Sequence, residues 1–295
     1  MSLLIGLSVV IVAYDGEKPR VLTTLREGDL AALPFGAFDP DQHRTFELAL
    51  RGWVKEQTGF QLGYVEQLYT FGDRDRESPD VTMFNAAPDA RIVSVGYLAL
   101  TQEAERLPDT FEARWRGWYR HFPWEDHRNG RPAIIDRKLA PHLRTWSVGN
   151  SDRKSRAALA FGLDDHEWND ETVLERYELL YEAGLVEECA RDRGLPVPGF
   201  RMGEPMASDH RRILATAMSR LRSKLRYRPV IYELMPDEFT LTALQHTVEA
   251  VLGQSLHTQN FRRALDRTGN VEGTGKMSST GGRPAELYRF KRHDP

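Results

Sequence analysis

Cysteine is almost absent from this sequence, in which Cys189 is the single one among 295 residues. One cysteine cannot form an internal disulfide, so the composition excludes a disulfide framework and suits a reducing compartment. Long apolar runs are also missing, since the run Leu3–Ala13 is only about half as long as a bilayer span requires. No basic segment precedes it and no small-residue cleavage site follows it, which argues against a signal peptide. We therefore expect a cytoplasmic protein with no membrane partner, and we interpret this run as a buried first strand.

A strong net charge is absent as well, because the chain carries only −3 at pH 7. The charge is nevertheless unevenly divided. Residues 205–295 hold 15 Lys and Arg against 9 Asp and Glu, whereas residues 1–204 hold 25 against 34. An acidic body followed by a basic region indicates that one domain meets a polyanion, although surface charges that only face water can produce the same count.

No repeat or low-complexity tract divides the chain. Its residue pattern and its content of Trp nevertheless change along its length, which suits two domains. Residues 1–110 alternate strand-like segments and turns around one predicted helix at 45–58, whose apolar side chains recur at helical spacing. Residues 111–204 contain five of the six Trp and several helical stretches. A Pro- and Gly-rich stretch at 194–205 indicates an ordered linker, and a basic helix is predicted over 208–226.

The clearest local pattern lies in the C-terminal part of the chain. Thr240 stands at the N-cap position of a predicted helix that carries one apolar stripe and closes at Gly253. A short turn leads to a second helix starting near Thr258, in which Phe261 and Leu265 face inward. Two helices joined by a short turn, with hydrogen-bonding side chains near the start of the second, are typical of a helix-turn-helix reader of DNA.

A wing follows the second helix. A strand begins near residue 270, a Gly- and Ser-rich loop spans 276–282, and a returning strand covers 286–290. Amide and guanidinium groups on the second helix suit base edges, and cations on the wing suit phosphates. A winged helix that makes only protein contacts is the alternative. The candidate DNA-binding residues are Thr258, Gln259, Asn260, Arg262, Arg263, Lys276 and Arg283.

Several runs in this region form a specific combination. They are Tyr227-Arg228-Pro229-Val230, Glu238-Phe239-Thr240-Leu241, Gln259-Asn260-Phe261-Arg262-Arg263, Gly281-Gly282-Arg283-Pro284-Ala285 and Leu287-Tyr288-Arg289-Phe290. Together they closely resemble Nudix-related transcriptional regulators of the NrtR type, almost continuously over residues 209–290. The resemblance implies a winged helix that binds double-stranded DNA, in a regulator that commonly controls NAD synthesis genes.

Two runs in the N-terminal half extend the resemblance. Leu33-Pro34-Phe35-Gly36 is similar to the entry of a Nudix box, and Lys55-Glu56-Gln57-Thr58-Gly59-Phe60 is similar to its exit. The strands around them resemble the same regulators and ADP-ribose pyrophosphatases. In the hydrolases, glutamates on one helix face hold Mg²⁺ against a diphosphate, because hard cations take oxygen ligands.

Most of those glutamates are missing here. With the pattern anchored on Gly59, its Arg-Glu pair falls on Gly52-Trp53, its Glu-Glu pair on Glu56-Gln57, and its upstream glutamate on Arg44. Gly36 is also two residues further from Gly59 than the pattern requires. Because only Glu56 survives, we predict that pyrophosphatase activity is lost, with no catalytic residue and no bound metal.

A ligand-binding pocket can persist after its catalytic activity is lost. The resemblance implies ADP-ribose or an NAD-related nucleotide as an effector, with no cofactor required. Arginines could meet its diphosphate and a Trp could stack on its adenine, although a surface Arg is more often a solvated charge and this Trp is more often core. The candidate ligand-binding residues are Arg26, Arg51, Glu56, Arg74, Arg91 and Trp118.

These observations predict an α+β protein with four parts. A Nudix-like α/β/α sandwich covers 1–124, a helical insertion and linker 125–204, a connecting basic helix 205–228, and a winged helix-turn-helix domain 229–295. The insertion is similar to that of longer regulators proposed for NAD metabolism in alphaproteobacteria, and it could serve dimerisation, ligand capping or stability. We expect a homodimeric repressor of NAD metabolism genes, since such readers usually meet two half-sites. The alternative is an active hydrolase of ADP-ribose or a related nucleoside diphosphate, in which Glu56 joins Glu47 or Glu66 in a rebuilt metal site.

Overall fold

The structure, a computed structural model, describes residues 3–25, 30–73, 91–102, 112–225, 230–278 and 284–291. Its centre is a mixed sheet in the order β3-β2-β1-β6-β5, with β4 paired to β1 and β7 to β2. The strands of this sheet are β1 Leu3–Tyr14, β2 Pro19–Leu25, β3 Ala31–Ala32, β4 Phe35–Ala37, β5 Tyr64–Phe71, β6 Arg91–Leu100 and β7 Ala113–Gly117. The α-helices are α1 Phe46–Thr58, α3 Ala140–Trp146, α4 Ser151–Phe161, α5 Val173–Glu182, α6 Glu187–Asp192, α7 His210–Leu225, α8 Leu241–Leu252 and α9 Thr258–Thr268.

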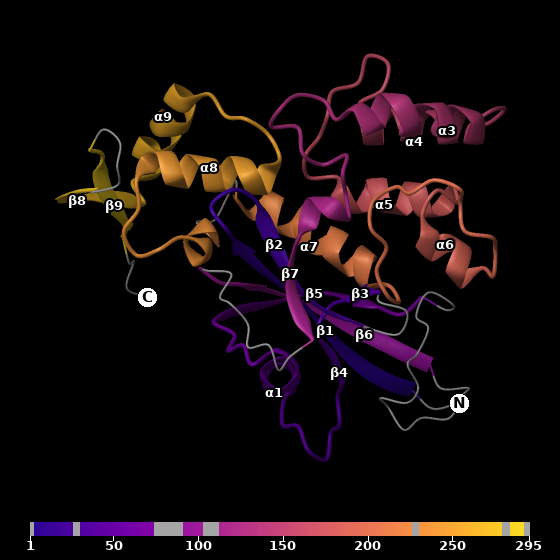
Figure 1. Cartoon of the computed structure of the whole chain (residues 1–295), viewed down its shortest axis with the longest axis horizontal. Helices are drawn as coiled ribbons and strands as arrows, with labels where there is room; N and C mark the ends of the chain where they lie inside the picture. The colour runs from indigo at the N-terminus through magenta and orange to yellow at the C-terminus, as the bar shows by residue number, and fades with distance from the viewer. Residues whose placement is uncertain are drawn as a thin grey trace.

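Strand β1 lies at the middle of the sheet and is buried on both faces, which explains its almost unbroken apolar sequence. Val9 and Ile11 belong to the core on the side of α1, whereas Val10 and Val12 belong to the core on the side of α7. The sheet is therefore sandwiched between α1 and α7, as Figure 1 shows. The predicted α/β/α sandwich is confirmed.

Helix α1 begins and ends where its capping residues predict. The Thr45 hydroxyl accepts a hydrogen bond from the Leu48 amide at 3.2 Å, and Gly59 closes the helix with a φ of 71°. A left-handed backbone of this kind is tolerated best by glycine. Local chemistry thus determines the length of the helix, while the sheet determines which face it buries.

Helix α7, which lies in the stretch 205–228 that we predicted as a connecting helix, also packs on the sheet. Its side chains Ile213, Leu214 and Ala217 are buried in the core that also holds the second face of the sheet. In the sequence, the whole insertion thus lies between the strands of the sheet and the helix that completes the sandwich. Sequence patterning missed this because an amphipathic helix shows that it has a partner without showing which one.

The basic residues of α7 do not form a surface for a polyanion. Arg211 is 1% exposed and pairs with Glu188 at 3.2 Å, and Arg222 is fully buried. Residues 229–295 by themselves contain eight Lys and Arg and eight Asp and Glu. The charge asymmetry of the sequence therefore comes from 205–228, and it is weak evidence for nucleic acid binding.

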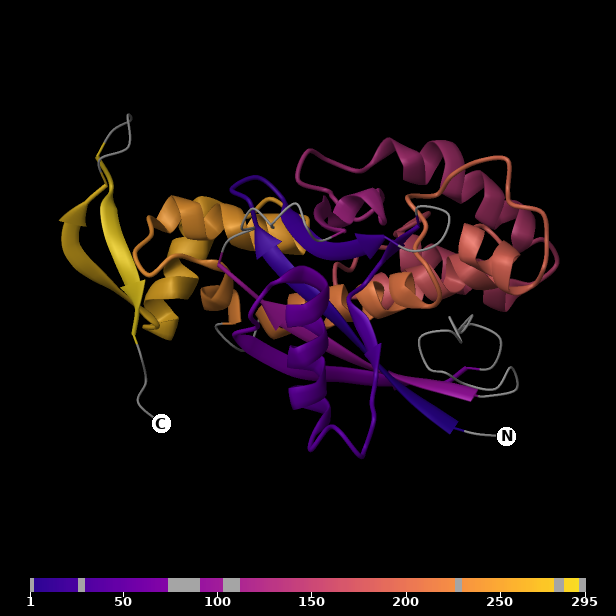
Figure 2. The same ribbon diagram turned by 60° about the horizontal axis from the view of Figure 1, so that its bottom comes forward.

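The insertion packs on α7 at the end of the molecule opposite the wing (Figures 1 and 2). The short 3-10 helix η2, Trp118–Arg120, precedes it, and it runs through the π-helical segment η3, Ile135–Leu139, and through α3 to α6. Trp124 and Tyr177 are fully buried in it. The linker that follows is docked on the sheet, because the Ala207 amide donates to the Ala31 carbonyl at 2.9 Å.

The C-terminal part forms the predicted winged helix. The 3-10 helix η4, Val230–Leu234, precedes α8, α9 and the two-stranded sheet of β8, Val271–Met277, and β9, Glu286–Phe290. The Thr240 hydroxyl caps α8 by accepting from the Ala243 amide at 3.1 Å. Backbone hydrogen bonds in both directions between Phe239 and Tyr288 join the wing to the start of α8. No helix in the described ranges is long and apolar enough to cross a lipid bilayer.

A buried ionic cluster lies where the insertion, α7 and α8 meet. The Glu125 carboxylate accepts from Arg176 Nε at 2.6 Å and from Arg222 Nη1 at 2.6 Å, and all three side chains are fully buried. Burial acts to raise the pKa of Glu125, but the two guanidinium groups outweigh it and hold the pKa below its usual value. The cluster is therefore ionised at neutral pH.

Two imidazoles make the stability of the fold depend on pH. Burial lowers the pKa of His121 and of His127 from 6.5 to about 4. Because both pKa values return to about 6.5 on unfolding, the unfolded chain binds more protons than the folded chain between these limits. We expect the free energy of unfolding contributed by these groups to be complete above pH 7 and to fall as the pH drops from 6.5 towards 4. Urea denaturation at pH 7 and pH 5 measures this fall.

The variant His127→Phe provides the control. His127 stacks on Trp168 with the ring centroids 4.0 Å apart, and a phenyl ring retains this contact without titrating. The variant should lose less stability than the wild type between pH 7 and pH 5. Equal losses in the two proteins would contradict the assignment to His127.

Candidate functional site

Helix α9 presents a polar face to solvent. Gln259, Asn260 and Arg262 are exposed, whereas Phe261 and Leu265 are half-buried and pack against the core. Arg263 is exposed as well. The structure thus places these four predicted DNA-binding side chains on one accessible helix, with donors suited to base edges and phosphates.

The turn between α8 and α9 is held by two side chains that the sequence analysis did not single out. The Glu249 carboxylate accepts from the Leu256 amide at 2.8 Å and from the Gln245 side-chain amide at 2.9 Å. Gln245 also donates to the Leu256 carbonyl at 3.0 Å and to the Thr258 hydroxyl at 3.3 Å. Thr258 therefore helps to fix the start of α9. A Gln and a Glu four residues apart on a helix were the available signal, since such residues share a face.

The predicted cation of the wing has an internal partner. Lys276 is 66% exposed on β8, and its ammonium lies 2.6 Å from the Glu238 carboxylate just before α8. A DNA phosphate would have to compete with this carboxylate for the ammonium. Arg283 lies outside the described residues.

The helix positions that hold metal-binding carboxylates in Nudix hydrolases serve here to attach α1 to β4. The Gln57 side chain exchanges two hydrogen bonds with the Phe35 backbone, at 3.2 and 2.5 Å. The Trp53 indole donates to the Ala37 carbonyl at 2.9 Å and covers Gly36 so closely that a Cβ there would lie 2.4 Å from the ring. Both side chains bind backbone, which leaves neither available for a cation.

The remaining carboxylates do not meet. Glu47 pairs with Arg51 at 2.8 Å, and Glu56 is exposed nine residues further along α1, about 13 Å away at 1.5 Å per residue. Glu66 pairs with Lys224 of α7 and so lies on the other face of the sheet. No group of three or more His, Cys, Asp or Glu side chains able to hold a metal is found among the residues that the structure describes.

The arginines predicted to bind the nucleotide are not brought together either. Arg51 donates to the Gly63 carbonyl beside the Leu100 end of β6, whereas Arg91 starts the same strand and donates to the Gly72 carbonyl. Nine residues of strand separate these ends by roughly 30 Å, too far for one diphosphate. Arg26 and Arg74 lie outside the described residues.

The structure argues against the prediction that Trp118 stacks on an adenine. This residue is fully buried in the large core that joins the sheet to the insertion, so its ring has no face for an adenine. Sequence reasoning considered this outcome because several other Trp residues lie nearby, and the core accounts for their number.

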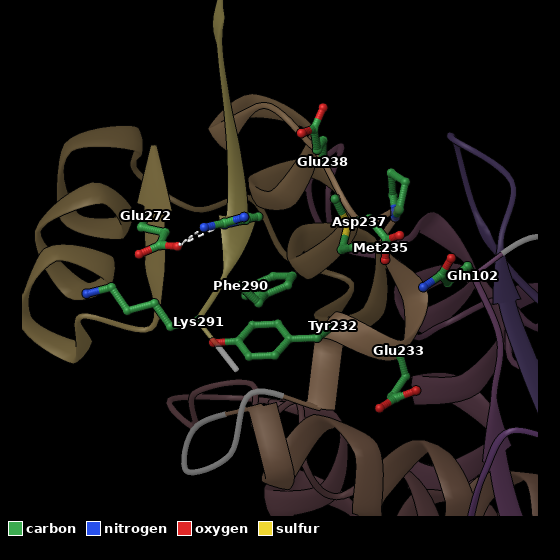
Figure 3. Close-up of a pocket in the computed structure, with 11 residues that line it drawn as sticks. Gln102, Tyr232, Glu233, Met235, Asp237, Glu238, Glu272, Phe290 and Lys291 are labelled. Carbon is green, nitrogen blue, oxygen red and sulfur yellow. Dashed lines mark hydrogen bonds and ion pairs between the residues drawn. The ribbon is translucent and has the colours of Figure 1, made fainter. Parts of the chain in front are cut away.

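A cavity of about 970 Å³ lies between the end of β6, η4 and the wing, and Figure 3 shows its lining. Tyr232 and Phe290 stack at its centre with the ring centroids 3.1 Å apart. Its carboxylates outnumber its cations, which disfavours a diphosphate. The charged side chains of its lining are Glu233, Asp237, Glu238, Glu272, Arg289 and Lys291.

Comparison with known families settles the nature of the C-terminal part. Residues 231–290 match the NrtR DNA-binding winged helix domain. The resemblance seen in the sequence is thereby confirmed, and α9 is the second helix of an NrtR-type winged helix. The chain is also 44% identical over 89 residues to a protein of Acinetobacter baylyi described as an ADPR-responsive transcriptional repressor. That segment covers 30% of this chain and 36% of the Acinetobacter protein, so the match spans about a third of the relative.

Solved structures share the fold over nearly the whole chain. The NrtR of Shewanella oneidensis matches with a TM-score of 0.58 and 21% identity, covering 98% of this chain and 94% of that one. The same protein in complex with a 27mer DNA matches with a TM-score of 0.57. A MutT/nudix family protein of Enterococcus faecalis has a TM-score of 0.58 and 19% identity, covering 99% and 87%. The fold is thus a Nudix sandwich followed by an NrtR-type winged helix.

The variant Arg262→Ala tests the exposed face of α9. If the guanidinium reads a base, its loss should weaken binding to the preferred sequence by about 1–3 kcal/mol and relax the choice of base at one position. Binding to a library of DNA sequences, sequenced after selection, measures both effects. Arg137→Ala, an exposed Arg of the insertion, is the matched control. Equal selectivity in the two variants would place the DNA-reading surface elsewhere.

Proposed function

We propose that this chain is a transcriptional repressor whose winged helix binds operator DNA and whose Nudix sandwich senses a nucleotide. The observation that carries the proposal is the exposed polar face of α9 within a domain that matches the NrtR DNA-binding family. The S. oneidensis NrtR, which has this fold, binds a 27mer DNA in its crystal structure. Helix α9 is the element that enters the major groove in such readers.

The proposed effector is ADP-ribose or an NAD-related nucleotide, and the proposed targets are genes of NAD metabolism. The A. baylyi relative is ADPR-responsive, which supports a ligand of this class. No cofactor is required by the proposal. The binding residues remain proposals: Arg51 and Arg91 lie near opposite ends of β6, and Arg26 and Arg74 lie outside the described residues.

The sandwich is proposed to have lost hydrolysis. Trp53 and Gln57 occupy positions where the hydrolases carry metal-binding glutamates, and both bond to the backbone of β4. One remaining glutamate, Glu56, gives a divalent cation too few oxygen ligands. The alternative, a hydrolase rebuilt with Glu47 or Glu66, is not favoured because these carboxylates face different partners.

We propose a homodimer as the acting form. A helix-turn-helix reader that occupies two half-sites about one helical turn apart requires two copies related by a two-fold axis. An effector then changes DNA affinity if it binds two arrangements of the dimer with different strength.

The ion pair of Lys276 and Glu238 generates a prediction about non-specific binding. Replacing Glu238 by Gln removes the internal competitor, so the ammonium becomes available to a phosphate. Because exposed pairs contribute little, we expect affinity for all sequences to rise by only about two- to fivefold, with a steeper salt dependence of up to about one unit. Glu182→Gln, which breaks an exposed pair with Arg156, is the control. Unchanged salt dependence in Glu238→Gln would show that Lys276 does not meet phosphate.

The function itself is tested by binding of the purified protein to promoters of NAD synthesis genes from its own genome. The assay is run at fixed salt, with and without ADP-ribose, and with Arg262→Ala as the variant of weakened selectivity. Sequence-selective binding that ADP-ribose alters supports the proposal. Release of AMP from ADP-ribose with Mg²⁺ at ordinary turnover rates, without selective DNA binding, would establish the hydrolase instead.

A further inference from the structure

The carbonyl end of α8 is capped from outside the winged helix. The last carbonyls of a helix have no partner within it and must find donors elsewhere. Ala250 O accepts from the Tyr119 hydroxyl at 2.7 Å, and Val251 O accepts from Arg222 Nε at 2.9 Å. We call residues 1–225, which hold the sandwich and the insertion, the sensor half. Just beyond the helix, the Gly253 carbonyl accepts from an amide of this sensor half. The first helix of the helix-turn-helix therefore ends on the sensor half.

The donor to Gly253 is the His127 amide, at 2.7 Å. Gly253 also has a left-handed backbone, with a φ of 70°. A Cβ at this position would lie 2.2 Å from the Glu125 carbonyl and 2.8 Å from the Tyr119 hydroxyl. The end of α8 thus approaches the segment 119–127 at backbone distance, and a residue with a side chain cannot stand there without displacing one of the two parts.

Arg222 is the centre of this junction. Its guanidinium has five N–H donors, and they meet acceptors from three segments. Besides Val251 O, these acceptors are the Glu125 carboxylate at 2.6 Å, Asp170 O at 2.9 Å, and the Tyr119 hydroxyl and Glu125 O, both at 3.3 Å. The planar fork holds the insertion, α7 and α8 in one relative orientation.

A second contact reaches the turn of the helix-turn-helix. The Ser255 hydroxyl donates to the Arg128 carbonyl at 2.8 Å, while the Arg128 guanidinium donates to the Glu17 carbonyl at 2.9 Å. Glu17 lies in the turn that joins β1 to β2. The turn before α9 is thus linked through one residue to the hairpin of the sensor sheet.

We infer that Tyr119, His127, Arg128 and Arg222 form an interdomain clamp that positions the helix-turn-helix on the sensor half. The clamp holds α8 by its carbonyl end and the following turn by Ser255, so α9 keeps a fixed direction relative to the sandwich. The inference deepens the proposed function, on which its DNA-binding part rests. A fixed direction matters to a dimeric reader, because restraining both recognition helices before binding removes ordering entropy from the binding step.

Two mild variants open the clamp without removing the buried charges. Tyr119→Phe keeps the ring and loses the hydroxyl that meets Ala250 O, and Ser255→Ala loses the bond to Arg128 O. The matched controls are Tyr69→Phe, whose side chain is 61% exposed on β5, and Ser155→Ala on the exposed face of α4. All four proteins are studied as the full chain.

Amide hydrogen exchange of the free protein is the first readout, and it does not depend on DNA. The His127 amide is itself a donor of the clamp, so its exchange reports opening directly. We expect peptides covering 119–130 and 249–256 to exchange about 3- to 10-fold faster in both clamp variants, with α1 and the β8–β9 sheet unchanged. Unchanged exchange in these two peptides, or equal acceleration throughout the chain, would overturn the clamp.

Affinity for the promoter DNA that the wild type binds is the second readout. We expect a roughly 3- to 10-fold loss in both clamp variants and none in the controls. Faster exchange with unchanged affinity would overturn the positioning role. If the wild type binds no promoter selectively, the proposed function fails, and hydrogen exchange alone then decides whether the clamp exists.

Discussion

The buried carboxylate of Glu125 is the point on which the arrangement of the three parts depends. Two guanidinium groups and a carboxylate lose much of their hydration when buried, and their attraction offsets this cost only if the remaining N–H groups are also bonded. The surrounding backbone meets that demand with four carbonyls from three segments. These acceptors are Ala160 O, Asn169 O, Asp170 O and Val251 O. A charge cluster of this kind contributes more to one defined arrangement of the parts it joins than to stability.

Hydrogen bonds from two side chains of α1 attach this helix to the sheet of the sandwich. The Trp53 indole and the Gln57 side-chain amide donate to backbone carbonyls of β4. The winged helix, in turn, is not strongly basic. Its balance of charge is even, and α9 carries three of its eight basic residues, Arg262, Arg263 and Arg267, beside Asp266. Affinity for a polyanion therefore depends on a few placed side chains more than on a general field.

The sequence predicted what local chemistry determines. The ends of α1 and α8 follow from Thr45 and Thr240 as N-caps and from glycines in the left-handed conformation, and the winged helix follows from the alternation of helix, turn and strand. The sequence could not predict the clamp because the residues at this junction are distant in the chain: Glu125 and Arg222 are 97 residues apart. The separation of Arg51 and Arg91 could not be predicted either, since arginines spaced along a sequence carry no information about which end of the sheet they reach.

The position of α7 has a consequence for how the chain is made. The sheet strands end at residue 117, but the helix that covers their second face is completed only at residue 225. During synthesis that apolar face therefore stays uncovered until about a hundred further residues have been added, at a rate of roughly 5–20 residues per second. The insertion must leave the ribosome before the sandwich can close, so it is in the folding path of the sensor. A fragment cut at residue 124 would carry the same bare face permanently and would be prone to aggregation.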